Sequence, residues 1–129
     1  MNRGEFQELA LIRLQDAKTL LDHECYDGAY YLSGYAIECA LKACIAKKTK
    51  EFDFPDKKLI EKIYTHDLTK LLGVVGIRVE ENLVVNWAVV KDWSEQDRYK
   101  RHTEEEARDI YNAVANPEEG VLEWIKQHW

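Results

Sequence analysis

Apolar residues recur at helical spacing over residues 3–48, and this periodicity constrains the fold more than any other feature of the sequence. From Arg3 to His23 the apolar positions follow the three- and four-residue steps of one helix face. They are Phe6, Leu9, Ala10, Leu14, Ala17, Leu20 and Leu21. A second helix is expected from Asp27 to Lys48, after the segment "CYDGA". The chain therefore begins with two consecutive helices.

The middle of the chain continues this pattern. A connector containing the first proline, "TKEFDFPDK", leads into an expected short helix over 57–64. A further helix starts in "THDLTKLL", where Thr65 can cap and Asp67 favours the positive end of the helix dipole. Its inward-facing residues are Leu68, Leu71, Leu72 and Val75. Residues 80–93 fit either a strand or a helix, and a helix is favoured because no partner strand is visible.

The last third has two more helix starts after a loop over 92–102. Thr103 and Glu106 form the sequence pattern of a capping box. Asn116 is expected to cap the final helix, with Pro117 at its first position. Glycine (6) and proline (2) are too scarce for a loop-rich fold. The sequence predicts an all-α fold, an antiparallel up-and-down bundle of four to five helices.

Length and charge limit the function. The 129 residues suit one domain over 1–129, which needs no disulfide or metal to be stable. The net charge of −6 argues against sequence-blind nucleic-acid binding, unless a local basic patch exists. Cys25, Cys39 and Cys44 have no zinc spacing, and their odd number favours reduced thiols in a cytoplasmic protein. No signal peptide or membrane-spanning run is visible, and no cofactor is implied.

Four polar or aromatic side chains share one side of the second helix. On a helical wheel, small residues gather on one side, namely Ala29, Ser33, Ala36, Ala40 and Ala43. The opposite side carries what we call the polar strip, which consists of Tyr31, Tyr35, Glu38 and Lys42. Its spacing of i, i+4, i+7 and i+11 places two charges in the middle of an otherwise apolar helix.

Three interpretations of the polar strip remain open. Glu38 and Lys42 can form an ordinary surface pair, worth about 0.2–0.5 kcal/mol. Alternatively, Glu38 can meet Arg13, which projects from the apolar stripe of the first helix, because an unpaired buried charge costs several kcal/mol. In the third interpretation, the strip lines a ligand groove or a dimer interface. The second and third interpretations are compatible.

The order of several motifs resembles a known family. The chain carries "AYYLSGYAIECALKA" with Glu38 and Lys42 four residues apart, a His-Asp-Leu helix start at His66 and Asp67, and then "RY" before "TEEEARDIYNAV". Over nearly the whole chain, this is similar to the HEPN domain family, whose name stands for higher eukaryotes and prokaryotes nucleotide-binding.

This resemblance implies an all-α homodimer. Many members of the family are paired with a small nucleotidyltransferase in toxin–antitoxin or two-component systems, and others are metal-independent RNases. The RNases carry an Arg, four to six residues, and then a His. Here only three residues separate Arg98 from His102, so the RNase pattern is not met.

The segment Arg98–His102, "RYKRH", is the only dense basic patch in the sequence, and we call it the basic turn. RNA cleavage without metal needs a base, an acid and a cation, which Arg98, Arg101 and His102 could supply. The simpler interpretation is a solvated basic loop before a capped helix, and it is favoured here. A phosphate would still be attracted to this patch first.

The remaining histidines and tryptophans favour structural roles. His66, at a helix start, is expected to cap or to bond a nearby carboxylate, and no metal-binding spacing links the four histidines. Tryptophans are expected as core or interface anchors, with Trp93 and Tyr99 beside the basic turn as candidates for base stacking.

The hypothesis that follows is a dimeric, non-catalytic binding module for a nucleotide, RNA or a small nucleotidyltransferase. Its expected ligand-binding residues are Tyr31, Tyr35, Glu38, Lys42, Arg98, Tyr99 and Arg101. Arg13, His66 and Asp67 are expected to be structural polar residues. Two alternatives stay open: an RNase toxin using Arg98 and His102, and a purely structural interaction domain.

Overall fold

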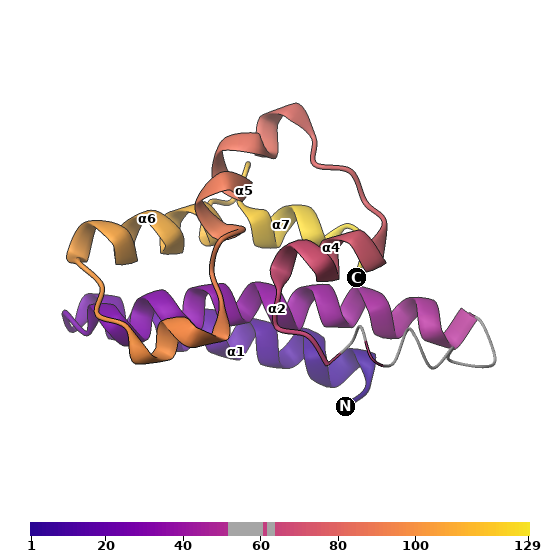
Figure 1. The fold of residues 1–129 in the computed structure, drawn as a ribbon, viewed down its shortest axis with the longest axis horizontal. Helices are drawn as coiled ribbons and strands as arrows, with labels where there is room; N and C mark the ends of the chain where they lie inside the picture. Colours follow the sequence, from indigo (N-terminus) through magenta and orange to yellow (C-terminus); the bar gives the residue numbers. More distant parts are fainter. Residues whose placement is uncertain (52–60, 62–63) are drawn as a thin grey trace.

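A computed structural model describes residues 1–51, 61 and 64–129 of the chain. Within these residues the fold contains six α-helices, two short 3-10 helices and no strand (Figure 1). The expected all-α helical bundle is therefore confirmed. The short helix expected over 57–64 falls largely outside the described residues. No helix in the described ranges is long and apolar enough to cross a membrane.

The two longest helices form the base of the molecule. Helix α1 spans Arg3–Asp22 and α2 spans Tyr26–Glu51, so both expected helices are present with slightly shifted ends. The helices run antiparallel and lie side by side along the length of the molecule (Figure 1). A tight turn joins them, and Glu24 within it adopts a positive φ of 61°. The pair provides the surface onto which the other elements pack.

Helix α2 is the central helix of the bundle. Besides α1, it contacts α4 (Leu68–Val75), α6 (Glu104–Ala115) and α7 (Val121–Lys126). The neighbouring helices can approach α2 closely because small residues recur along it. These residues are fully buried: Ala29, Ser33, Ala36, Ala40 and Ala43. A helix surrounded by others must bury side chains all round. A polar group in the middle of α2, such as Glu38 at 2% exposure, is therefore buried in the bundle.

Helix α5 (Val84–Val90) forms an outer layer against α6 and α7, preceded by the 3-10 helix η1 (Glu81–Leu83). The helical interpretation of this segment is confirmed. Leu83, Trp87 and Val90 are buried at helical spacing. The remaining valines of α5 are exposed: Val84, Val85 and Val89.

Two local expectations were wrong. Helix α7 begins at Val121 with Gly120 as its N-cap, while Asn116 Oδ1 accepts hydrogen bonds from the backbone N–H groups of Glu118 and Glu119 in the preceding turn. The segment after α5, expected as a loop, contains the 3-10 helix η2 (Glu95–Tyr99). Its start has a full capping box formed by Ser94 and Asp97.

The cap expected for α6 is confirmed, whereas the expectation that Thr65 caps α4 was wrong. Thr103 and Glu106 form the capping box of α6. At α4 the N-cap is Asp67, whose side chain accepts from the backbone N–H of Lys70, and Thr65 Oγ1 accepts from the N–H of Asp67. The cap positions His66 immediately before α4, facing the middle of α2.

Candidate functional site

Glu38, in the middle of α2, is buried and has two partners. Its side chain is 2% exposed, and its carboxylate lies 3.2 Å from Lys42 Nζ and 2.9 Å from His66 Nδ1. The pair with Lys42 is present, but it is not the surface pair that the first interpretation expected. The bond to Arg13 was also a wrong expectation, because Arg13 pairs with Asp16 at 2.9 Å on its own helix. Histidine and lysine together compensate the buried carboxylate.

His66 reaches a second carboxylate on η2. Its Nε2 lies 3.0 Å from Glu95 Oε2, so the imidazole ring spans from α2 to η2. We call the set Glu38, His66 and Glu95 the histidine bridge. An open hollow of about 400 Å³ lies beside it, between the start of α4 and the segment 91–96. The expectation that His66 bonds a nearby carboxylate is confirmed.

The two phenols of the polar strip stack on each other, and Tyr31 also lies against Trp93. Tyr31 stacks on Tyr35 with ring centroids 6.0 Å apart and lies 5.6 Å from the Trp93 ring. The Trp93 indole Nε1–H donates to the Tyr31 carbonyl at 3.1 Å. A Cβ on Gly34 would lie 2.2 Å from this indole, so only glycine permits the approach. Trp93 is buried, which rules out the expected stacking of a base on it.

Burial changes the acid–base properties of the strip. It raises the pKa of Tyr35 to about 12, with the Cys39 thiol and Glu38 adding to the effect. Burial also raises the pKa of Tyr31, while the nearby Arg98 guanidinium opposes the rise. The Cys39 thiol, buried beside Glu38, has its pKa raised to about 11. These groups are all neutral at physiological pH and act as hydrogen-bonding or packing surfaces.

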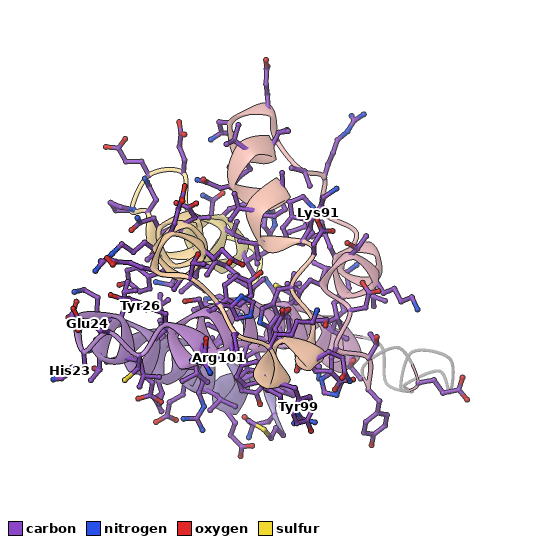
Figure 2. All side chains as sticks on the ribbon, turned by 60° about the vertical axis from the view of Figure 1, so that its left-hand side comes forward. His23, Glu24, Tyr26, Lys91, Tyr99 and Arg101 are labelled. Atoms are coloured by element: carbon purple, nitrogen blue, oxygen red, sulfur yellow. The ribbon has the colours of Figure 1, made fainter. Side chains whose placement is uncertain are left out.

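The basic turn begins in the last two residues of η2 and projects its long side chains into solvent. Arg98 lies over the Tyr99 ring, 4.9 Å from its centroid, and Tyr99 is 72% exposed. Arg101 Nε forms an ion pair with Asp27 Oδ2 at 2.8 Å, although its side chain is 94% exposed. Figure 2 shows Arg101 between Tyr99 and the start of α2, which is marked by Tyr26. The turn therefore offers accessible cations and an accessible phenol.

His102, at the end of the basic turn, is part of the protein interior. Its side chain is 5% exposed, and its ring stacks on Tyr30 with centroids 3.6 Å apart. Nδ1 lies 3.3 Å from Glu106 Oε2, and Nε2 lies 3.4 Å from Asp97 Oδ1 without hydrogen-bond geometry. Its backbone N–H donates to Asp27 Oδ1 at 2.6 Å. His102 thus fastens the turn to α2 and α6.

The structure divides the predicted site residues into two groups. His66 lies with Glu38 and Lys42 and reaches Glu95 of η2. Tyr35 stacks on Tyr31, and Arg98 lies near Tyr31. Tyr99 and Arg101 lie further along the turn, on the outside, and Arg13 belongs to neither group.

Sequence reasoning missed two acids, Glu95 and Asp97. The tetrapeptide "SEQD" at 94–97 has the Ser-x-x-acid pattern of a cap and could have revealed the η2 start. Nothing local indicates that Glu95 meets His66.

The arrangement suits anion binding better than metal or covalent chemistry. In the described part of the chain, no group of three histidine, cysteine or acidic side chains is placed to hold a metal ion. Arginine and lysine at the turn can hold phosphate oxygens, and an exposed tyrosine can stack on a base.

One comparison identifies the family. A family model of the HEPN domain matches residues 5–128, which is nearly the whole chain. Neither the curated proteins nor the solved structures contain a match. The chain therefore belongs to the HEPN domain family, and at the level of the family it is a nucleotide-binding or RNA-related module.

Proposed function

We propose that this member of the HEPN domain family is a binding module that holds a nucleotide or an RNA strand at the basic turn and does not cut RNA itself. The supporting observation is a contrast in accessibility within five residues. Arg98, Tyr99, Lys100 and Arg101 are exposed, whereas the side chain of His102 is only 5% exposed. Exposed cations are available to phosphates, and a buried imidazole is not available to a reacting hydroxyl.

The surroundings of His102 argue against the RNase alternative. A general base must come within hydrogen-bond reach of the proton that it removes. Both ring nitrogens of His102 face carboxylates of its own chain, Glu106 and Asp97, and one ring face is covered by Tyr30. The short spacing from Arg98 points the same way. The histidine is therefore assigned to holding the turn.

The partner side of the proposal is a homodimer that acts with a small nucleotidyltransferase, as in toxin–antitoxin or two-component systems. Its support is family membership together with the exposed apolar face of α5. Val85, 75% exposed, is the most accessible of its valines. Apolar side chains grouped on one helix face favour contact with another protein surface.

Binding is tested by titrating a fluorescent single-stranded RNA with the protein and measuring anisotropy at several salt concentrations. The double variant Arg98→Gln/Arg101→Gln should bind more weakly, and its salt slope should fall by about 0.7 for each lost phosphate contact. Arg78→Gln, which removes one such charge on the exposed connector after α4, is the control and should bind like the wild type. Equal binding by all three proteins would refute the proposed site.

Cleavage is tested separately by incubating the protein with total RNA in EDTA. We expect the RNA to remain intact. Degradation that disappears in Arg98→Gln would establish the RNase alternative, since Arg98 is exposed and its loss should not unfold the protein.

The dimer is tested by light scattering of the purified protein, where twice the mass of one chain is expected. Val85→Asp should return the chain to a monomer, while Leu11→Asp, on the outer face of α1, should not. A wild-type monomer would remove the homodimer from the proposal.

A further inference from the structure

The two contacts of His66 impose a requirement on its protons. Nδ1 lies 2.9 Å from Glu38 Oε1 and Nε2 lies 3.0 Å from Glu95 Oε2. A neutral imidazole has one N–H donor and one lone pair, while a carboxylate only accepts. The Nδ1 contact is a hydrogen bond, which a single proton on Nδ1 satisfies. The Nε2 contact is an ion pair, which attracts Glu95 only when the ring carries two protons and is positively charged.

The two ends of the histidine bridge differ in strength. Glu38 is buried and keeps Lys42 as a second partner, so its contact with His66 belongs to the interior. Glu95 is partly exposed and is the first residue of η2. The charged groups around the ring come from each neighbouring element: Glu38 and Lys42 on α2, Asp67 at the start of α4, Glu95 on η2, and Lys91 and Asp92 at the hollow. A ring with one proton keeps the hydrogen bond to Glu38 and loses the ion pair with Glu95.

The bridge is one of the attachments that set the position of the basic turn. Element η2 extends from Glu95 to Tyr99, so the residue that His66 holds and two residues of the turn share one short helix. Asp27 holds the far end through Arg101 and the His102 backbone. Trp93 holds the near end through Tyr31. Releasing Glu95 would therefore remove the attachment at the first residue of η2.

From this geometry we infer that His66 is a positioning residue that holds η2 on α2 only in its doubly protonated form, so that the basic turn is ordered at acidic pH and loosens as the pH rises. Histidine changes charge between about pH 5 and 8, within the physiological range. Ligand affinity at the turn falls with rising pH for the same reason. This last consequence rests on the proposed function, whereas the ordering of η2 does not.

A single substitution separates this inference from a purely structural role. In Glu95→Gln the side-chain amide can donate to the unprotonated Nε2, while Nδ1–H still donates to Glu38. This variant forms the bridge with a neutral ring and should keep η2 ordered at both ends of the pH range. Glu95→Ala cannot form the bridge and should leave η2 loosened throughout. Glu105→Gln, an exposed site on α6, is the charge-matched control.

The experiment is a pH titration followed by NMR without any ligand. The reporters are the backbone amides of residues 95–99 and the Trp93 indole N–H, whose bond to Tyr31 is sensitive to the position of this segment. The wild type and Glu105→Gln should show one transition in which the 95–99 amides shift and broaden as pH rises. Glu95→Gln should lack that transition and keep sharp signals, and Glu95→Ala should show the broadened signals at every pH.

Two results would overturn the inference. One is a wild type whose η2 amides do not respond to pH. The other is the wild-type transition persisting in Glu95→Gln, since it would then arise from His102, which lies near Asp97 and is present in every variant. Because no ligand is used, failure of RNA binding would refute the proposed function and leave this test unaffected.

Discussion

The surroundings of Glu38 and the basic turn both contain several charges, but they carry these charges in opposite environments. Glu38 is 2% exposed and has Lys42 and His66 within hydrogen-bond distance. Arg101 has an equally short contact with Asp27, yet its side chain is 94% exposed. Water screens the exposed Arg101–Asp27 pair much more than it screens the contacts of the buried Glu38 carboxylate. Short distances alone therefore do not tell which charges stabilise the fold and which are available to a ligand.

The largest effect is expected from removing the buried acid. Glu38→Ala leaves the largely buried Lys42 ammonium without its partner, removes the hydrogen bond to His66, and should lower the free energy of unfolding by about 3 kcal/mol. Urea denaturation followed by circular dichroism measures this loss. Glu8→Ala, at an exposed position on α1, is the control and should stay within about 0.5 kcal/mol of the wild type. Equally small losses of stability in Glu38→Ala and Glu8→Ala would mean that Glu38 is solvated and that its environment does not differ from that of the basic turn.

A similar contrast exists between two helical glycines. A Cβ on Gly34 would lie 2.2 Å from the Trp93 ring, whereas one on Gly73 in α4 would meet nothing within 4 Å. Gly34→Ala should therefore destabilise by about 2 kcal/mol through overpacking. Gly73→Ala should instead stabilise by up to about 1 kcal/mol, because alanine favours the helix. Thermal unfolding of both variants tests the prediction, and a stabilised Gly34→Ala would contradict the packing of Trp93 on α2.

The dependence of stability on alkaline pH tests whether the phenol groups of Tyr30 and Tyr35 are buried. Burial raises the pKa values of Tyr30 and Tyr35 to about 12. In the unfolded chain the pKa of tyrosine is about 10. Above that pH the unfolded state releases protons that the folded state keeps, so stability should fall between about pH 10 and 12. Urea midpoints measured over this range should fall less steeply in Tyr35→Phe, and an unchanged slope would indicate that Tyr35 is not buried.

The smallest stability effect is expected at the basic turn. Arg101→Gln should change the free energy of unfolding by less than about 0.5 kcal/mol despite the 2.8 Å contact with Asp27, because the guanidinium is exposed. The same variant should bind single-stranded RNA more weakly in the anisotropy assay. A large loss of stability with unchanged RNA binding would show that Arg101 stabilises the fold and does not bind the ligand.

Much of the fold could be predicted from local sequence. The apolar periodicity of α1, α4 and α5 correctly gave helices and their buried faces. The Thr103–Glu106 capping box located the start of α6. Such features depend on residues three or four positions apart, which one helical turn brings together. Helix η2 was missed because its apolar content is low and its cap lies in a polar tetrapeptide.

The candidate site was predicted only in part. The wheel correctly grouped Tyr31, Tyr35, Glu38 and Lys42 on one side of α2, since that grouping depends on one helix alone. Which residue meets Glu38 depends on how distant segments pack, and the guess of Arg13 was wrong. His66 is 28 positions away from Glu38 in the sequence. No periodicity relates two residues so far apart.

The sequence by itself determined the helices of this protein, the side of α2 that carries polar groups, and the position of a basic patch in an acidic chain. Only the tertiary structure decided that Glu38 is buried between Lys42 and His66, and that His102 points inward while Arg98 and Arg101 point outward. The physical reason is range. Helix formation and capping are satisfied within a few residues, whereas burial and charge pairing are properties of surfaces that come from separate parts of the chain.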